Sequence, residues 1–408
     1  MCDYLNFLVR GLLNETQRRM KDLIFLKTFM KPPGGLSRKG NSGMPGKGGR
    51  ILEPEIEPSG SVVLVRRLPG ILHLELNRPE AINSLTLDMV RMVARELETS
   101  RNDNGVKLVL LSGRGERGFC AGGDIKIMAR AAAENDIQPA MQFLKEENDL
   151  DLAVHLYPKP VVVLAHGITM GGGLGIAAGA DIVVATESTR MAMPETRIGF
   201  FPDVGATGWL FVKCGRGYPE FLGLTGYELK GPQCVGVGLA SCLIPTSGLP
   251  KAIEAVIAHA PGLANDRHDA ADQIREILGP FTKKDILKDP EMDQWVEEYF
   301  AGKTSVSGIL NGLKECSTHD ELCEGVFERL SERSPLAVAI TLQCLRRNEG
   351  RDLGEVYRSD LKVARYLMEQ HDFKEGVRAR LIDRDNRPQW DPDTFEKAAV
   401  MLRFISFE

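Results

Sequence analysis

The sequence has few of the features that mark a metal site, a disulfide framework or a membrane span. Its eight cysteines include no C-x-x-C pair, and its seven histidines form no cluster with metal-ligand spacing. These absences argue against a zinc site and a disulfide framework and favour a reducing compartment. The longest apolar stretch, residues 161–185, contains His166, Asp181 and several glycines. It is therefore too polar and too broken to span a membrane.

A large excess of charge of one sign is also missing. The formal net charge is −5, with 43% hydrophobic and 26% charged residues, which is an ordinary globular composition. This balance argues against nucleic acid or an acidic membrane surface as the main partner. With 408 residues the chain can bury a full core, and its length suggests two or three domains or one large one.

The first sixty residues differ in composition from the rest. Residues 31–49 are rich in Gly, Pro and Lys without an apolar period, which predicts a flexible linker. Residues 4–30 mix apolar and basic side chains as a transit peptide does, but Asp3, Glu15 and Asp22 count against that interpretation. We therefore interpret residues 1–58 as a dispensable extension, or as the result of a start codon placed too far upstream.

Regular secondary structure is predicted from residue 61 onward. Two short strands, 61–67 and 70–77, are separated by a Leu-Pro-Gly turn and form a hairpin. A helix capped by Thr86 follows, and 106–113 is a fully apolar strand. The alternation continues through 160–187, as a strand, a glycine-containing helix and a second strand. This order predicts an α/β fold with a largely buried parallel sheet.

Beyond about residue 250 the strand signals stop. Amphipathic helical segments separated by Gly, Pro and Asn take their place. We therefore divide the remaining chain into a core, residues 59–250, and a helical C-terminal region, residues 251–395, which belongs to the same catalytic unit.

A triple glycine and two carboxylates carry most of the chemical information. The glycines lie in AHGITMGGGLG after an apolar run, and Glu195 and Asp203 follow in MAMPETRIGFFPDVG. Glycines let backbone N–H groups approach a ligand without a Cβ in the way, which is how an oxyanion hole is built. A carboxylate held near such a hole can act as a base or nucleophile on an acyl group. A tight turn followed by two ordinary surface acids is the alternative interpretation.

Five blocks in order carry a resemblance to a known family. LELNRPEAINSLT, GRGERGFCAGGDI, KPVVVLAHGITMGGGLG and MAMPETRIGFFPDVG resemble the crotonase (enoyl-CoA hydratase/isomerase) superfamily. The last two, with HDFKEGVRARLIDRDNRPQW, are similar to the 3-hydroxyisobutyryl-CoA hydrolase family. The resemblance covers residues 61–392. It implies the ClpP/crotonase-like fold, in which repeated ββα units form a spiral core, followed by a helical C-terminal region.

The resemblance also implies an acyl-CoA substrate and the residues that bind it. Its thioester carbonyl would lie between the N–H groups of Gly123 and Gly172, the second at a helix start that adds its dipole. Glu147, Glu195 and Asp203 match the substrate-binding acids of the hydrolases, and Glu195 and Asp203 are the catalytic candidates. No cofactor is implied, because coenzyme A is part of the substrate.

Two departures from the related patterns are informative. Hydratases carry a first glutamate two residues after the triple glycine, and this chain has Gly175 there, which cannot transfer a proton. The hydrolases usually read FPDVGGG, whereas Ala206 and Thr207 follow FPDVG here. We expect these two side chains to lie near the acyl pocket and to affect which acyl group fits.

The sequence therefore predicts a hydrolase of a short 3-hydroxyacyl-CoA, most simply 3-hydroxyisobutyryl-CoA as in valine breakdown. Two alternatives stay open: a hydratase or isomerase of the same fold, and a crotonase-like structural subunit without turnover. The superfamily commonly forms trimers, so a homo-oligomer is possible. A prokaryotic cytoplasm is the preferred location, with the mitochondrial matrix as the alternative.

Overall fold

The larger of the two sheets in the described part of the chain has six strands and is almost entirely parallel. A computed structural model describes residues 60–286, 288–316 and 319–405, so the predictions for residues 1–58 lie outside the described residues. Only β1 and β2 pair antiparallel, through the predicted hairpin, and the other neighbours are parallel. The strand order is β1 (Val63–Leu68), β2 (Gly70–Leu76), β3 (Val106–Gly113), β5 (Val161–Ala165), β7 (Ile182–Ala185) and β10 (Cys242–Leu243).

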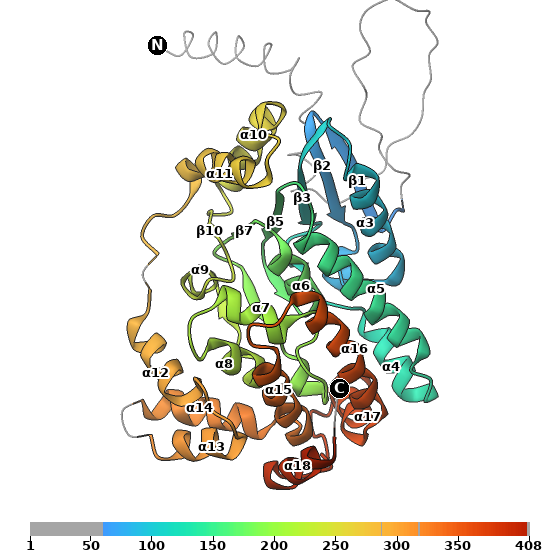
Figure 1. Ribbon diagram of the computed structural model, residues 1–408, viewed down its shortest axis with the longest axis vertical. Helices are drawn as coiled ribbons and strands as arrows, with labels where there is room; N and C mark the ends of the chain where they lie inside the picture. Colours follow the sequence, from blue (N-terminus) through green and yellow to red (C-terminus); the bar gives the residue numbers. More distant parts are fainter. Residues whose placement is uncertain (1–59, 287, 317–318, 406–408) are drawn as a thin grey trace, which may run out of the picture. The chain divides into compact units, whose positions relative to one another are not determined.

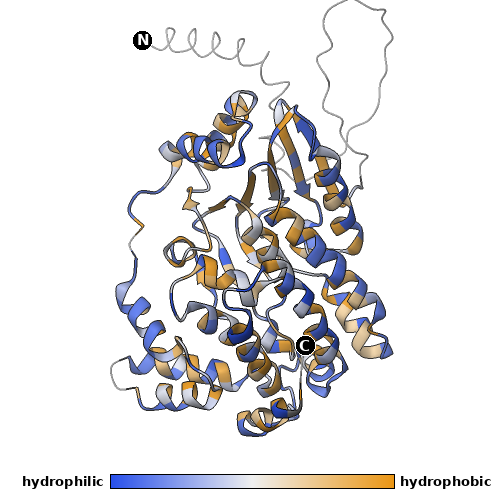
Figure 2. Cartoon of the chain, in the orientation of Figure 1, coloured by the Kyte–Doolittle hydropathy of each residue, from blue (hydrophilic) through white to orange (hydrophobic). Residues whose placement is uncertain are grey.

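Both faces of this sheet are covered, as the apolar strand sequences predict. Side chains alternate across a strand, so Leu110 and Val162 point to one face and Val109 and Val163 to the other. The first pair faces α10 (Leu249–His259) and α11 (Arg267–Leu278). The second pair belongs to the main core, beside α3 (Leu87–Ser100) and α5 (Gln138–His155). Figure 2 shows the orange, hydrophobic strands between helices of mixed colour. The sheet is therefore a buried framework.

The first helix confirms the N-cap that its sequence predicts. Helix α3 spans Leu87–Ser100, and the Thr86 hydroxyl accepts a hydrogen bond from Met89 N at 3.3 Å. Helix α5 (Gln138–His155) packs along α3, as Figure 1 shows. Together they cover the face of the sheet that carries Val109 and Val163.

A second sheet of four very short strands was not predicted. It contains β4 (Gly118–Cys120), β6 (Ile168–Met170), β8 (Arg190–Ala192) and β9 (Leu229–Lys230). Strands of two or three residues are too short to produce a recognisable alternation. Because β4, β6 and β8 run parallel, their carboxyl ends share one edge. That edge positions the site, since the chain leaves it into the two glycine segments and into the segment of Glu195.

The C-terminal helices confirm the predicted helical region and fold back over the core. Helix α15 packs on α7 and α8, α16 packs on α5 and α7, and α17 packs on α4 and on the short helix that begins at Glu195. In Figure 1 the red-brown α15 and α16 lie beside α7. The bounds are α4 (Ile125–Glu134), α7 (Ala206–Lys213), α8 (Tyr218–Thr225), α9 (Pro232–Val237), α12 (Pro290–Phe300), α13 (Val306–Lys314), α14 (Asp320–Ser331), α15 (Pro335–Asn348), α16 (Leu353–Glu369), α17 (His371–Val377) and α18 (Phe395–Met401).

The cysteines depart from expectation in one place. Cys316 and Cys323 form a disulfide, although their spacing matched no motif used in the sequence analysis. The other described cysteines, Cys120, Cys214, Cys234, Cys242 and Cys344, are free. Within the part of the chain that the structure describes, no helix is both long and apolar enough to cross a membrane, and no group of three or more potential ligands could hold a metal ion.

Candidate active site

The structure brings all five predicted site residues to one cavity of about 290 Å³. Two of its walls differ in kind: one consists of glycine backbone and the other of carboxylic acids. A larger surface hollow of about 710 Å³, between α5 and α16, contains none of these residues. The predicted residues lining the cavity are Gly123, Glu147, Gly172, Glu195 and Asp203.

The first glycine segment presents a free backbone N–H. Leu85 N donates to Gly122 O and Asp124 N donates to Leu85 O, both at 2.8 Å, which holds the loop on either side of Gly123. No backbone carbonyl in the described residues accepts from Gly123 N. Gly122 has φ +98°, and a Cβ on it would lie 3.3 Å from Gly172 N. The two glycine segments are therefore in direct contact.

The second glycine segment begins helix α6 (Gly172–Gly179), which lies between α5 and α7 (Figure 1). Leu174 N and Gly175 N donate to Gly171 O, while Gly172 N finds no acceptor among the described backbone carbonyls. A Cβ on Gly173 would lie 2.5 Å from Cys120 O, so only glycine permits this approach. Gly123 N and Gly172 N together have the properties of an oxyanion hole, one of them at the positive end of a helix.

An ion pair braces the first glycine loop. Asp124 caps α4 by accepting from Lys126 N at 3.0 Å, and its other oxygen lies 2.9 Å from Arg78 Nη2. Arg78 also donates to Ser84 O at 2.6 Å. Both charged side chains are mostly buried, so the loop is held from outside the cavity while its N–H stays available.

Glu195 enters the cavity at the start of the short helix η2 (Glu195–Ile198), three residues after β8. Its Oε2 is buried without a hydrogen-bond partner in the described residues, and its Oε1 lies 3.1 Å from the position of a Cβ on Gly171. Burial, then the charge of Asp203, raises its pKa well above the usual value. Glu195 is thus poorly solvated and adjacent to the glycine wall.

Asp203 lies in a tight turn before α7. Val204 and Gly205 adopt φ values of 49° and 73°, and the first is strained for a β-branched residue. Gly205 N donates to Asp360 Oδ2 at 2.8 Å, which fixes the turn to α16. Burial raises the pKa of Asp203 to about 7. This carboxyl group can therefore exchange a proton near neutral pH.

Glu147 completes the acidic wall from α5. Its Oε1 has no hydrogen-bond partner in the described residues and lies so close to Gly172 that a Cβ there would overlap it. Burial, then the charge of Asp203, raises the pKa of Glu147 well above the usual value. Since several buried carboxylates cannot all be charged at close range, some of the carboxyl groups in this wall are protonated at neutral pH.

Sequence reasoning missed a second layer of buried polar groups behind this wall. Asp151 lies one turn after Glu147 on the same buried face of α5, and neither of its oxygens has a partner in the described residues. Tyr357 and Asp360 reach the same region from α16. Burial, then Glu147 and Asp203, raises the pKa of Asp151. The i, i+4 spacing of Glu147 and Asp151 was the available signal, but Asn148 is buried on the same helix, so the sequence pattern alone does not mark this face as apolar.

The two departures from the related patterns have different outcomes. At Gly175 a Cβ would lie 2.6 Å from Asp151 Oδ2 and 2.8 Å from Val204 Cβ, so no side chain fits there. The expectation for Ala206 and Thr207 was wrong, because neither lines the cavity. Both are buried, and the Thr207 hydroxyl accepts from Asn348 Nδ2 at 2.8 Å. These residues pack α7 against α15.

The fold and the site together indicate the class of protein to which the chain belongs. A parallel sheet, two glycine segments with free N–H groups and an adjacent acid form a site for a carbonyl compound, and the fold is of the crotonase type. The enoyl-CoA hydratase/isomerase family model matches residues 71–402. The chain belongs to this family.

The similar proteins are named either as hydrolases or as hydratases and dehydratases. The chain is 36% identical to the human protein "3-hydroxyisobutyryl-CoA hydrolase, mitochondrial", covering 78% of this chain and 81% of that protein. The zebrafish protein of the same name is 33% identical, with coverage of 85% and 89%. A crystal structure titled carnitinyl-CoA dehydratase, from Mycobacterium thermoresistibile, has TM-score 0.75 and 33% identity, covering 85% of this chain and 97% of that one. An enoyl-CoA hydratase from Rhodobacter sphaeroides has TM-score 0.73 and 29% identity, with coverage of 84% and 97%.

Proposed function

We propose that this protein hydrolyses a short 3-hydroxyacyl-CoA thioester, with 3-hydroxyisobutyryl-CoA as the preferred substrate. The observation that carries the proposal is the pairing of Glu195 and Asp203 in one cavity with the free N–H groups of Gly123 and Gly172. The relatives named as 3-hydroxyisobutyryl-CoA hydrolases support the choice of substrate. The reaction is consistent with a place in valine breakdown.

The reaction needs charge stabilisation on oxygen and a proton for sulfur. The thioester carbonyl oxygen would accept from Gly123 N and Gly172 N, each typically worth about 3–4 kcal/mol in the transition state. Ionised Glu195 either removes a proton from water, whose oxygen then bonds to the carbonyl carbon, or attacks that carbon itself. In both routes the C–S bond breaks and the leaving sulfur takes a proton. The second route passes through a mixed anhydride that water then hydrolyses.

Asp203 suits a role with protons and with the substrate hydroxyl. Its pKa of about 7 lets it hold a proton in some of the molecules and release it in others at neutral pH. A buried carboxyl group needs a partner, and a 3-hydroxyl can donate to it. We assign Glu147 to substrate binding, because its Oε1 borders both Gly172 and Gly123.

A hydratase is the main alternative, since the similar crystal structures carry hydratase or dehydratase titles. Gly175 disfavours it: the position of the first hydratase glutamate has no side chain, and its space is filled by Asp151 and Val204. Asp151 does not line the cavity and therefore does not replace that glutamate as a group in contact with substrate. A structural subunit without turnover is disfavoured by the intact set of five site residues.

Thiol release from a panel of acyl-CoAs tests the proposal. We expect fast release from 3-hydroxyisobutyryl-CoA, slower release from isobutyryl-CoA, and negligible loss of enoyl absorbance from crotonyl-CoA. Comparable rates of hydration and thiol release would indicate a hydratase. Absence of both activities would favour the structural subunit.

The remaining assignments follow from the same argument. We propose coenzyme A as part of the substrate and no separate cofactor. The names of the relatives favour mitochondria over the prokaryotic cytoplasm that the sequence analysis preferred. Homo-oligomerisation stays a prediction, which light scattering of the purified protein would test.

A further inference from the structure

The C-terminal segment that begins with α17 contributes to the cavity in a way that the mechanism has not used. Four of its residues, which we call the C-terminal lining, border the cavity: Phe373, Arg380, Leu381 and Asn386. The first part of the segment is held by backbone packing, because a Cβ on Gly376 would lie 2.4 Å from Ile198 O. Helix α17 therefore lies directly on η2, the short helix that begins at Glu195.

The second part of the segment is held differently, because little of it is buried. Residues 382–387 are all exposed. Arg384 and Asn386 both have φ 57°, in the left-handed region that costs free energy for a residue with a Cβ. An exposed turn with such a backbone keeps one conformation only when its surroundings hold it there.

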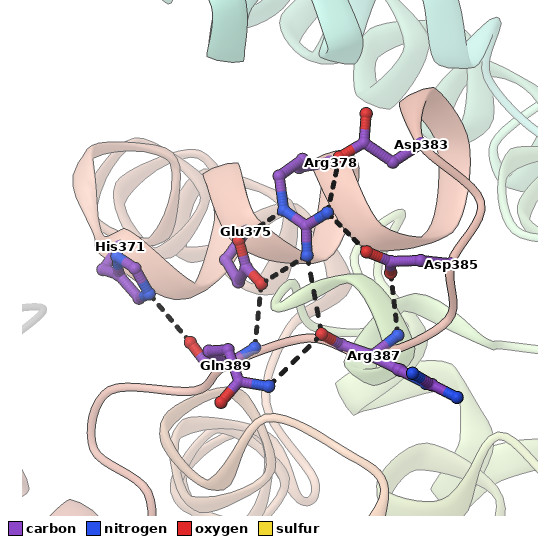
Figure 3. Close-up of polar contacts among 7 residues, drawn as sticks. All are labelled: His371, Glu375, Arg378, Asp383, Asp385, Arg387 and Gln389. Atoms are coloured by element: carbon purple, nitrogen blue, oxygen red, sulfur yellow. Dashed lines mark hydrogen bonds and ion pairs between the residues drawn. The ribbon is translucent and has the colours of Figure 1, made fainter.

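Arg378 makes the contacts that hold this turn, as Figure 3 shows. Its Nε and Nη2 donate to the two carboxylate oxygens of Glu375, both at 2.8 Å. Its Nη1 donates to Asp383 at 2.5 Å and to Asp385 at 2.7 Å. These bonds, that of Glu375 first, raise the pKa of Arg378 above its ordinary value. One guanidinium thus joins α17 to the turn through charge-assisted hydrogen bonds, which are the stronger kind.

The acids around Arg378 extend its hold along the turn. Glu375 Oε1 also accepts from Gln389 N at 2.8 Å, and Asp385 Oδ1 accepts from Arg387 N at 2.9 Å. Both contacts fix backbone N–H groups that follow Asp385. The turn is therefore tied to Arg378 on either side of Asn386.

Asn386 connects the turn to the cavity. Its N donates to Ala379 O at 3.0 Å, and its Oδ1 accepts from Arg380 Nη1 at 2.9 Å. Because Arg380 and Asn386 both line the cavity and bond to each other, a displaced turn would displace both side chains. Arg378 itself does not line the cavity.

We propose that Arg378 is a positioning residue for substrate binding, which acts by holding the turn that places Asn386 and Arg380 along the cavity. The inference rests on the proposed function, which makes this cavity the acyl-CoA site. It assigns Arg378 to binding and not to the chemical step, because the backbone packing of α17 on η2 does not depend on this side chain.

Arg378→Met tests the inference, since methionine keeps an apolar stem but has no guanidinium. We expect KM for 3-hydroxyisobutyryl-CoA to rise by at least about 10-fold, because binding must then order loosened side chains. We expect kcat to change by less than about 3-fold, because Glu195 stays in place. Steady-state thiol release gives both values. Calorimetric titration with coenzyme A should show a similar loss of affinity without turnover, so that loss in a protein that releases no thiol would contradict only the proposed reaction.

Two local measurements distinguish positioning from general damage. Amide hydrogen exchange of residues 383–389 should become faster in Arg378→Met. Trp390, which follows the turn, should become more accessible to acrylamide, and the other two tryptophans, Trp209 and Trp295, are only 2% exposed and should not respond. The denaturant midpoint should stay nearly unchanged, since ion pairs at the surface contribute little to global stability.

Asp385→Asn tests whether the effect passes through the turn. The amide oxygen still accepts from Arg387 N, so the change removes chiefly the charge that faces Arg378. KM should rise by less than in Arg378→Met, and the double variant should have the KM of Arg378→Met alone, because both changes break one contact. Additive effects of the two substitutions would contradict the inference.

Arg91→Met is the matched control, because Arg91 holds Glu146 with two hydrogen bonds of 2.7 Å and neither residue lines the cavity. Its KM and kcat should be those of the unmodified protein. Unchanged KM and coenzyme A affinity in Arg378→Met would overturn the inference, and so would a joint fall of kcat and the denaturant midpoint. Should Arg378→Met fail to fold, Asp385→Asn decides the matter: normal KM with normal exchange of residues 383–389 would overturn the inference.

Discussion

The two walls of the cavity differ in the groups that they present: backbone N–H groups on one wall and buried carboxyl groups on the other. The glycine wall presents the free backbone N–H groups of Gly123 and Gly172, which contribute no side chain. The acidic wall consists of Glu147, Glu195 and Asp203, which come from α5, η2 and a turn. The first wall depends on close backbone approach and the second on burial. We therefore expect the glycine wall to be sensitive to volume and the acidic wall to be sensitive to charge.

The largest effect is expected for Glu195→Gln. This change keeps the shape of the side chain but removes the base or nucleophile, so kcat should fall by at least about 100-fold while acyl-CoA binding is retained. Steady-state thiol release and calorimetric binding measure the two quantities. Glu254→Gln, at an exposed position on α10, should leave both unchanged. Near-normal turnover in Glu195→Gln would remove this residue from the mechanism.

Gly172→Ala tests the glycine wall by volume alone. The new methyl group would overlap Glu147 Oε1, so either the acid or the start of α6 must move away from the thioester oxygen. We expect kcat/KM to fall by about 10-fold or more, part of the value of one oxyanion donor. Gly236→Ala on α9 is the control, because a Cβ there meets nothing within 4 Å. Equal activities in the two variants would show that Gly172 N does not contact the reacting carbonyl.

The same contrast explains what the sequence could reveal. The glycine wall and the larger sheet were predictable, because glycine runs and apolar strands are local patterns that Gly171 to Gly173 and residues 106–113 display directly. The short strands β4, β6 and β8 were not, although they bring the site segments to one edge. Asp151 was missed because its importance depends on burial, which only the packing of α5 against α6 reveals. Ala206 and Thr207 were misplaced, because the resemblance indicated their sequence position but not their orientation.

Asp203→Asn tests whether the acidic wall recognises the substrate hydroxyl. In the unmodified protein we expect kcat/KM for 3-hydroxyisobutyryl-CoA to exceed that for isobutyryl-CoA by at least about 10-fold, since a site built around a hydroxyl is left with an unpaired polar group when it is absent. The variant should reduce this ratio. Equal rates for the two substrates in the unmodified protein would mean that the cavity does not recognise the hydroxyl.

The smallest effect on activity is expected for Asp151→Asn, which isolates charge in the second layer. Burial raises the pKa of Asp151 well above the usual value, so the folded protein holds it as a neutral acid that an amide closely mimics. At neutral pH we therefore expect kcat to change by less than about 3-fold, because no charge in contact with substrate is altered.

Stability should respond to the same substitution in a pH-dependent way. In the unfolded chain Asp151 loses its proton near pH 4, whereas in the folded protein it keeps the proton to higher pH. The unmodified protein therefore loses stability as pH rises through this window, by at most about 1.4 kcal/mol per pH unit from this group. The amide introduced by Asp151→Asn does not titrate and cannot contribute to that loss, so the variant should gain stability relative to the unmodified protein as the pH rises above about 4. Denaturant unfolding at several pH values measures the difference. Asp149→Asn, at an exposed position on the same helix, should show no such gain, and a constant difference for Asp151→Asn would mean that Asp151 is charged in the folded protein.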